Sequence, residues 1–148
     1  MSRPVLLDVN VVIALFDAAH VHHDLAHDWF ADNRVRGWAT TPLTENAVVR
    51  IIANPKYGSS SERAAQVASR LRAFCNSEDH RFWSASLSLR DPSRFDLTVV
   101  SHRHLTDVYL LGVAQANGGT LATFDRSIPA GAVLGTPAAT LEIIGAAP

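Results

Sequence analysis

Apolar runs alternate along the chain with amphipathic segments, and this alternation predicts strands followed by helices. The apolar run within residues 4–9 predicts a strand that is covered on both faces, as central parallel strands are. Residues 10–17 predict a short apolar helix that Asn10 caps. Residues 21–36 carry apolar side chains at helical spacing, which predicts an amphipathic helix that ends at Gly37.

The rest of the chain continues the same alternation. Thr41 and Pro42 form a strong helix start, because a hydroxyl N-cap precedes a proline in the first helical position. Gly118 and Gly119 form a helix stop. Helices are predicted over residues 42–54, 62–76 and 105–117, and strands over residues 38–41, 80–84, 120–124, 132–135 and 141–144. We therefore expect an α/β fold, a three-layer sandwich with a mainly parallel central sheet flanked by helices, in a single domain over residues 1–148.

Four carboxylates occupy positions where a solvated acid is not expected. Asp8 follows the first predicted strand and Asp125 follows the strand over residues 120–124. The carboxyl ends of parallel strands form the edge where open α/β proteins bind ligands. Glu45 and Asp107 each head an apolar helical stripe, with apolar residues three, four and seven positions later. Because an unpartnered buried carboxylate is costly, each acid needs a partner.

A shared divalent metal ion accounts for all four acids together. Taken singly, Asp8 and Asp125 also fit helix caps or turns, and Asp107 fits the favourable charge of a first helical turn. If the acids cluster, their repulsion raises their pKa values unless a cation is bound, and oxygen ligands select Mg²⁺ or Mn²⁺. Such ions activate water and stabilise charge on a phosphoryl group, so we expect a site that cleaves a phosphodiester.

Composition limits the alternatives without choosing a function. Of 148 residues, 47% are hydrophobic, enough for the core of one domain. No apolar run approaches the roughly 20 residues that span a bilayer, so we expect a soluble, cytoplasmic protein. The formal net charge of −1 gives no average field that attracts nucleic acid. Cys75 is the only cysteine, which excludes an internal disulfide and a multi-cysteine metal site.

Three stretches and their order resemble the PIN-domain ribonucleases, most closely the VapC-type toxins of bacterial toxin–antitoxin pairs. The stretches are LLDVNVVIALFD over residues 6–17, TPLTENAVVRII over residues 41–52 and HLTDVYLLGVAQANGGTLATFD over residues 104–125. The resemblance covers nearly the whole chain, with the least signal in the middle third. It implies that the four acids, Asp8, Glu45, Asp107 and Asp125, are the catalytic and metal-binding residues.

The same resemblance implies supporting residues and partners. Asn10 and Thr123 match polar positions that line the family's site, and Thr123 shares a strand face with Asp125, two residues later. His104 precedes Asp107 by one turn and is a further candidate near the pocket. By this resemblance the protein is a Mg²⁺- or Mn²⁺-dependent endoribonuclease that cleaves RNA with metal-activated water. The resemblance also implies a homodimer, no membrane association, and a small VapB-like antitoxin that places an arginine among the acids.

Two other functions stay open at this stage. His23 and His27 flank Asp24 in an HDLAH segment that imitates the HExxH zinc motif, with aspartate in place of glutamate. His22 and His23 with Asp24 also resemble the pair of HD-type phosphohydrolases, so a zinc- or HD-type hydrolase using His22, His23, Asp24 and His27 is an alternative. HD-type phosphohydrolases are all-helical, however, and strands are predicted here. A catalytically silent PIN fold that serves only as a binding module is the third option, and the presence of all four acids argues against it.

Overall fold

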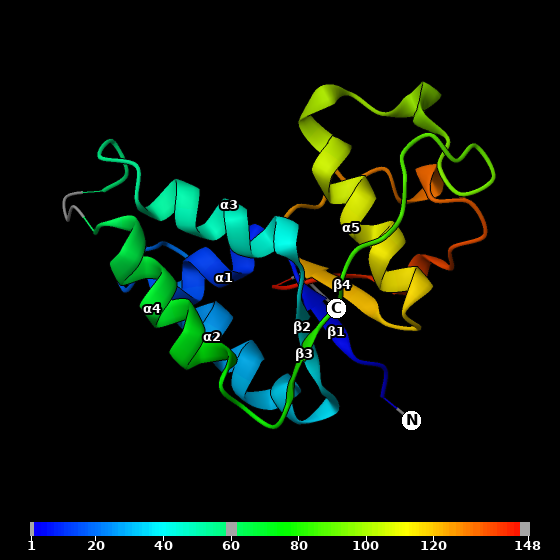
Figure 1. Cartoon of the computed structure of the whole chain (residues 1–148). Helices are drawn as coiled ribbons and strands as arrows, with labels where there is room; N and C mark the ends of the chain where they lie inside the picture. Colours follow the sequence, from blue (N-terminus) through cyan, green and yellow to red (C-terminus); the bar gives the residue numbers. More distant parts are fainter. Residues whose placement is uncertain (1, 59–61, 146–148) are drawn as a thin grey trace.

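A parallel sheet of five strands forms the centre of the molecule, in the order β3-β2-β1-β4-β5 (Figure 1). The computed structural model describes residues 2–58 and 62–145. β1 lies in the middle, and its Val5 pairs with Trp38 of β2 and with Thr120 of β4. The strands are β1 (Val5–Leu7), β2 (Trp38–Thr40), β3 (His80–Phe82), β4 (Thr120–Thr123) and β5 (Leu141–Ile143).

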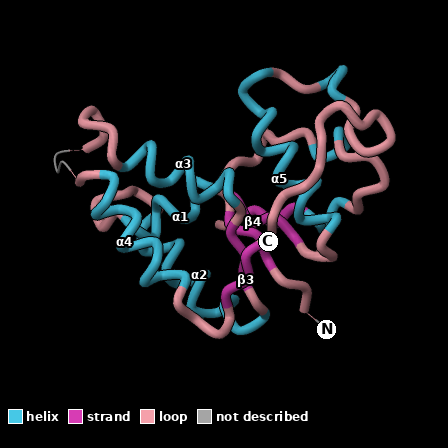
Figure 2. The backbone as a smooth tube through the Cα atoms, viewed as in Figure 1, coloured by secondary structure: helices cyan, strands magenta, loops and turns pink. Residues whose placement is uncertain are grey.

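Helices cover both faces of this sheet, as Figure 2 shows. Side chains alternate along β1, so Val5 and Leu7 pack into one hydrophobic cluster with α1 to α4, whereas Leu6 packs into a second cluster with α5. The helices are α1 (Val9–Phe16), α2 (His23–Asn33), α3 (Pro42–Ile52), α4 (Ala64–Cys75) and α5 (Leu105–Ala116). The prediction of a three-layer sandwich with a mainly parallel sheet is confirmed.

The turn from β1 into α1 differs from the sequence expectation. The predicted strand over residues 4–9 is shorter, because α1 already begins at Val9. Asp8 is the N-cap, and its Oδ1 accepts a hydrogen bond of 2.7 Å from the amide of Val9. The prediction that Asn10 caps the helix is therefore wrong, and Asn10 lies within the first turn of α1. By contrast, the predicted cap of α3 is confirmed, since Thr41 Oγ1 accepts from the amide of Thr44.

The predicted strand over residues 132–135 is also wrong. Val133 forms only an isolated antiparallel bridge with Phe95, after a 3₁₀ turn over Ala130–Ala132. Pro129 precedes this turn, and Gly135 adopts a positive φ of 72°, so the segment cannot run straight for the length of a strand. The segment over residues 21–36 divides into α2 and a 3₁₀ turn (Arg34–Arg36). None of the helices in residues 2–58 and 62–145 has both the length and the apolar character needed to cross a bilayer.

Candidate metal centre

Asp8 and Thr123 meet where β1 and β4 end. Leu7 pairs with Ala122, so the next residue of each strand emerges at the same edge of the sheet. Asp8 is only 3% exposed, and Thr123 is fully buried. Thr123 Oγ1 donates a hydrogen bond of 2.7 Å to Asp8 Oδ2, while the amide of Val9 donates to Asp8 Oδ1. Both carboxylate oxygens are therefore fixed in place.

Asn10 extends this group from the first turn of α1. Its Nδ2 donates to Thr123 Oγ1 at 3.2 Å, and the amide of Asp125 donates to the same oxygen at 3.1 Å. The Oδ1 of Asn10 is buried and has no hydrogen-bond partner among the described residues. A buried carbonyl oxygen that accepts no hydrogen bond from the protein is usually satisfied by a water or an ion.

Asp107 brings a second, half-buried carboxyl group to Asp8 from the first turn of α5. Burial, the negative charges of Asp8 and Asp125, and a hydrogen bond shared with Asp8 together raise the pKa of Asp107 to about 7. Burial also raises the pKa of Asp8, against the hydrogen bonds from Thr123 and Val9. Two carboxyl groups this close cannot both ionise easily unless a cation neutralises them.

Asp125 lies near this pair, but its carboxylate is turned toward its own loop. Its Oδ1 accepts hydrogen bonds from the amide and the hydroxyl of Ser127, at 2.8 and 2.5 Å. These bonds lower the pKa of Asp125. Its Oδ2 lies 3.6 Å from His104 Nε2, so His104 is near the site as expected from its position in the sequence. The negative charge of Asp125 nevertheless reaches both Asp8 and Asp107.

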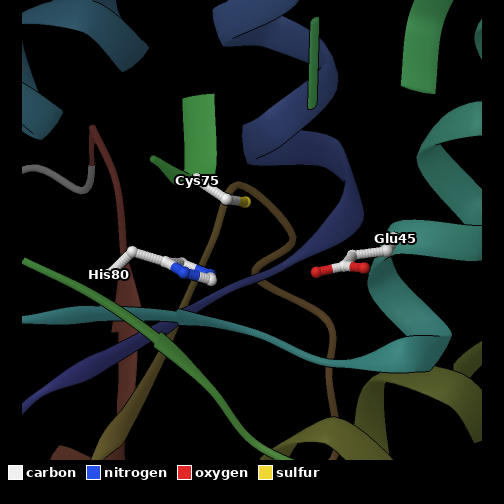
Figure 3. A group of neighbouring side chains, drawn as sticks. All are labelled: Glu45, Cys75 and His80. Carbon is white, nitrogen blue, oxygen red and sulfur yellow. The ribbon is translucent and has the colours of Figure 1, made fainter. Parts of the chain in front are cut away.

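The side chain of Glu45 lies in a second cluster, with Thr40, Cys75 and His80, and not beside Asp8. Its Oε2 accepts a hydrogen bond of 2.7 Å from Thr40, the last residue of β2, and Thr40 Oγ1 also lies 2.8 Å from His80 Nε2. Figure 3 shows the carboxylate of Glu45 facing the side chains of Cys75 and His80. Burial, followed by the charge of Glu45, raises the pKa of Cys75 to about 11. Burial lowers the pKa of His80, although the charge of Glu45 acts in the opposite direction.

The group around Asp8 suits a hard divalent cation. Its candidate donors are the carboxyl groups of Asp8 and Asp107 and the free oxygen of Asn10, with the charge of Asp125 nearby. Oxygen donors of this kind bind Mg²⁺ and Mn²⁺. A bound cation would also remove the repulsion that raises the pKa values of Asp8 and Asp107. The residues present therefore fit the ion that the sequence suggested, with Glu45 as the member whose side chain faces elsewhere.

The histidines at the start of α2 contact the end of α1 and Phe124. His23 Nδ1 lies 2.7 Å from the carbonyl oxygen of Ala14, and His27 Nε2 lies 3.1 Å from that of Leu15. One nitrogen of each ring is therefore engaged with a carbonyl at the end of α1, which has no other helical partner. The His22 ring stacks on Phe124. Nothing in these contacts favours the zinc- or HD-type hydrolase.

Comparison with known proteins identifies the family. The family model of the PIN domain matches residues 5–133. The chain belongs to the PIN-domain family. Ribonuclease VapC44 of Mycobacterium tuberculosis is 40% identical over 131 residues, which cover 88% of this chain and 92% of the relative. Ribonuclease VapC39 of the same organism is 42% identical over 83% of this chain and 89% of the relative. The resemblance to VapC-type PIN domains is thereby confirmed.

A solved structure gives the same fold. The crystal structure of Mycobacterium tuberculosis VapC20, described as a Sarcin-Ricin loop cleaving toxin, matches with a TM-score of 0.63. The match covers 89% of this chain and 98% of that chain, at 15% sequence identity. At this identity the match supports the fold of the PIN domain and carries no residue roles.

Four residues in these clusters were not candidates from the sequence: Thr40, Cys75, His80 and Ser127. Ser127 could have been found, because an aspartate followed two residues later by serine or threonine forms the same hydrogen-bonded turn at Asp91–Ser93 and Asp96–Thr98. Cys75 ends α4 and His80 begins β3. The approach of Cys75 to Glu45 depends on how α4 packs against α3, and that of His80 on how β3 pairs with β2. No local pattern signals either.

Proposed function

We propose that this PIN domain is a Mg²⁺- or Mn²⁺-dependent endoribonuclease that acts as the toxin of a type II toxin–antitoxin pair in the cytoplasm. Its relatives at about 40% identity over nearly their full length are named ribonucleases. The observation that carries the proposal is the approach of the half-buried carboxyl group of Asp107 to the buried Asp8, with the charge of Asp125 acting on both. Repulsion between these carboxylates is unfavourable without a cation, and a bound divalent ion would remove it.

Each residue of the acidic group has a proposed role in metal binding or catalysis. Asp8, Asp107 and Asp125 hold the ion, with Asn10 oriented beside them and Glu45 as a further ligand or the group that orients the attacking water. Thr123 positions Asp8 through its hydrogen bond to Oδ2. An ion held by these residues would make a water easier to deprotonate and would stabilise the negative charge on the phosphoryl group. Each carboxylate thus acts on the reaction through the charge and position that it provides.

Exposed basic residues border the acidic group and suit the RNA backbone. His102 and Arg103 are exposed immediately before α5, and the charge of Arg103 acts on Asp125. Arg126 is exposed directly after Asp125. Arginine side chains bind phosphate oxygens and position a strand without reading its bases. We expect the scissile phosphate to lie between these cations and the acids.

A small VapB-like antitoxin is the proposed protein partner, and a homodimer is the proposed assembly. A groove of about 550 Å³ runs between α3 and α5, and its lining includes Leu43, Leu105 and Tyr109. Leu105 and Thr106 on this groove directly precede Asp107. An apolar antitoxin segment in the groove would place the following residues near the acids, where an arginine could take the position of the cation.

RNA cleavage by purified protein tests the enzymatic proposal. We expect wild-type protein to cut RNA only with Mg²⁺ or Mn²⁺, Asp8→Asn to lose the activity, and His23→Ala to keep it. Circular dichroism of each variant checks the fold. A loss with His23→Ala and activity with Asp8→Asn would indicate the zinc- or HD-type hydrolase. No cleavage by wild-type protein would leave a PIN fold that only binds partners.

Co-expression with the product of the adjacent small reading frame tests the partner. The proposal predicts a complex in which RNA cleavage is blocked. A product that binds while cleavage continues at the same rate would contradict inhibition at the active site. Light scattering of the isolated protein measures the proposed dimer directly.

A further inference from the structure

A second group of possible metal ligands lies beside the acidic group. The donor atoms of Glu45, Cys75 and His80 all lie within 4.8 Å of one another (Figure 3). The three side chains come from α3, the last residue of α4 and the first residue of β3. Among the described residues this is the one trio of His, Cys, Asp or Glu donors that meets this criterion.

The donors differ in kind from those around Asp8. A carboxylate oxygen, a thiol sulfur and an imidazole nitrogen are the ligands that Zn²⁺ uses in proteins, and three such ligands leave one coordination position open. Mg²⁺ does not favour sulfur. Burial raises the pKa of the Cys75 thiol to about 11, so an occupant has to displace a firmly held proton. A thiophilic ion such as Zn²⁺ can do this by binding the thiolate.

Ions can reach the cluster from solvent. A groove of about 1220 Å³ runs between α3 and α4, and Glu45 and Cys75 are both part of its lining. All three side chains are partly buried, which removes competing water without closing the approach. This is the combination expected of an exchangeable metal site rather than of a sealed structural one.

We propose that Glu45, Cys75 and His80 bind a Zn²⁺-class ion and that the bound ion holds Glu45 away from the aspartates, which inhibits RNA cleavage. The inhibitory part rests on the proposed function, in which Glu45 belongs to the nuclease site. In the structure the described contacts of Glu45 already lie on the Cys75 side, through Thr40. The ion would stabilise this arrangement by direct ligation.

A hydrogen-bond network is the competing explanation for the cluster. Thr40 Oγ1 bonds to Glu45 Oε2 and lies within hydrogen-bond distance of His80 Nε2, so the hydroxyl alone could hold these two side chains together. A Thr40→Val substitution separates the two accounts. It removes the hydroxyl and keeps all three ligands, so the metal site should survive it.

Cobalt spectroscopy tests the binding directly, because Co²⁺ replaces Zn²⁺ and a thiolate ligand gives it a charge-transfer absorption in the near ultraviolet. Cys75 is the only cysteine of the chain, so this band reports on one sulfur. Untagged wild-type protein and Thr40→Val should both show the band, and Zn²⁺ should abolish it. Cys75→Ala should show no band, and His80→Gln should bind Co²⁺ at least about tenfold more weakly. His23→Gln is the matched control and should equal wild type.

Two results would overturn the metal site: no band in wild-type protein, which leaves the hydrogen-bond network, or the same Co²⁺ affinity in wild type and His80→Gln. The inhibitory part has its own readout. Zn²⁺ added with excess Mg²⁺ should stop RNA cleavage by wild type and not by Cys75→Ala, and equal inhibition of both would refute it. If wild type cuts no RNA at all, the proposed function fails, while the cobalt band still decides whether the site exists.

Discussion

The two polar clusters lie on neighbouring strands of one sheet and offer different donor atoms. Asp8 directly follows β1, Thr123 is the last residue of β4, and Thr40 is the last residue of the neighbouring β2. Parallel strands bring all these residues to one edge. The strands supply Asp8 to one cluster and His80 to the other. The packed helices add the remaining donors: α5 supplies Asp107 on one side, while α3 and α4 supply Glu45 and Cys75 on the other. Strands and helices together therefore give the two clusters their different chemistry.

The largest effect should come from removing one carboxylate of the oxygen cluster. Asp107→Asn should lower the rate of RNA cleavage by about 100-fold or more, because the ion loses a ligand and several kcal/mol of transition-state stabilisation. Initial rates at saturating Mg²⁺ or Mn²⁺ measure it. The cobalt band of Cys75 should be unchanged. Cleavage within about threefold of wild type would exclude Asp107 from the site.

A smaller loss of activity should follow when Asp8 keeps its charge but loses the hydrogen bond from Thr123. Thr123→Val removes the hydroxyl that donates to Asp8 Oδ2 and accepts from Asn10. Loss of such a supporting bond typically weakens metal affinity by about 10- to 100-fold, and a titration of activity against Mn²⁺ measures the shift. Thr98→Val is the matched control, since Thr98 makes a similar bond to Asp96 in an exposed turn. Equal affinity for Mn²⁺ in Thr123→Val and wild type would show that Thr123 plays no part.

Removal of an arginine beside the acidic group should weaken RNA binding by less than Thr123→Val weakens Mn²⁺ binding. Arg103→Ala should weaken RNA affinity by about threefold to tenfold, because one phosphate contact is lost, and the effect should shrink as salt rises. Binding is measured with the uncleaving Asp107→Asn variant as background. Arg90→Ala, which removes an exposed arginine from another loop, is the control. An identical loss in both variants would point to net charge instead of a local contact.

The smallest effect concerns stability without metal. The carboxyl group of Asp107 has a pKa of 3.8 in an unfolded chain and about 7 in the folded protein. The folded state therefore binds this proton more tightly, and stability falls as the pH rises from about 4 to about 7. After allowance for solvent screening, Asp107→Asn should be more stable than wild type by about 1 kcal/mol at pH 8 and equal to it near pH 3. Denaturant unfolding in chelator measures this, and a pH-independent difference would contradict it.

The sequence predicted the oxygen cluster better than the sulfur-containing one for a physical reason. Asp8 and Asp125 stand directly after apolar strands, and Asp107 heads an apolar helical stripe, so local patterns singled out all three as candidates. The direction of the Glu45 side chain depends on Thr40 and His80, whose approach is set by the pairing of β2 with β3. The N-cap assigned to Asn10 failed for a related reason, since Asp8 and Asn10 are both good caps and tertiary packing chose between them.

Binding of Mn²⁺ measured by electron paramagnetic resonance tests most directly whether the aspartates share a divalent ion. Free Mn²⁺ gives a strong signal that weakens on binding, so the titration needs neither RNA nor catalysis. Wild-type protein should bind Mn²⁺, and Asp8→Asn and Asp107→Asn should each bind it at least about tenfold more weakly, while Cys75→Ala should match wild type. Unchanged binding in both aspartate variants would contradict the shared site.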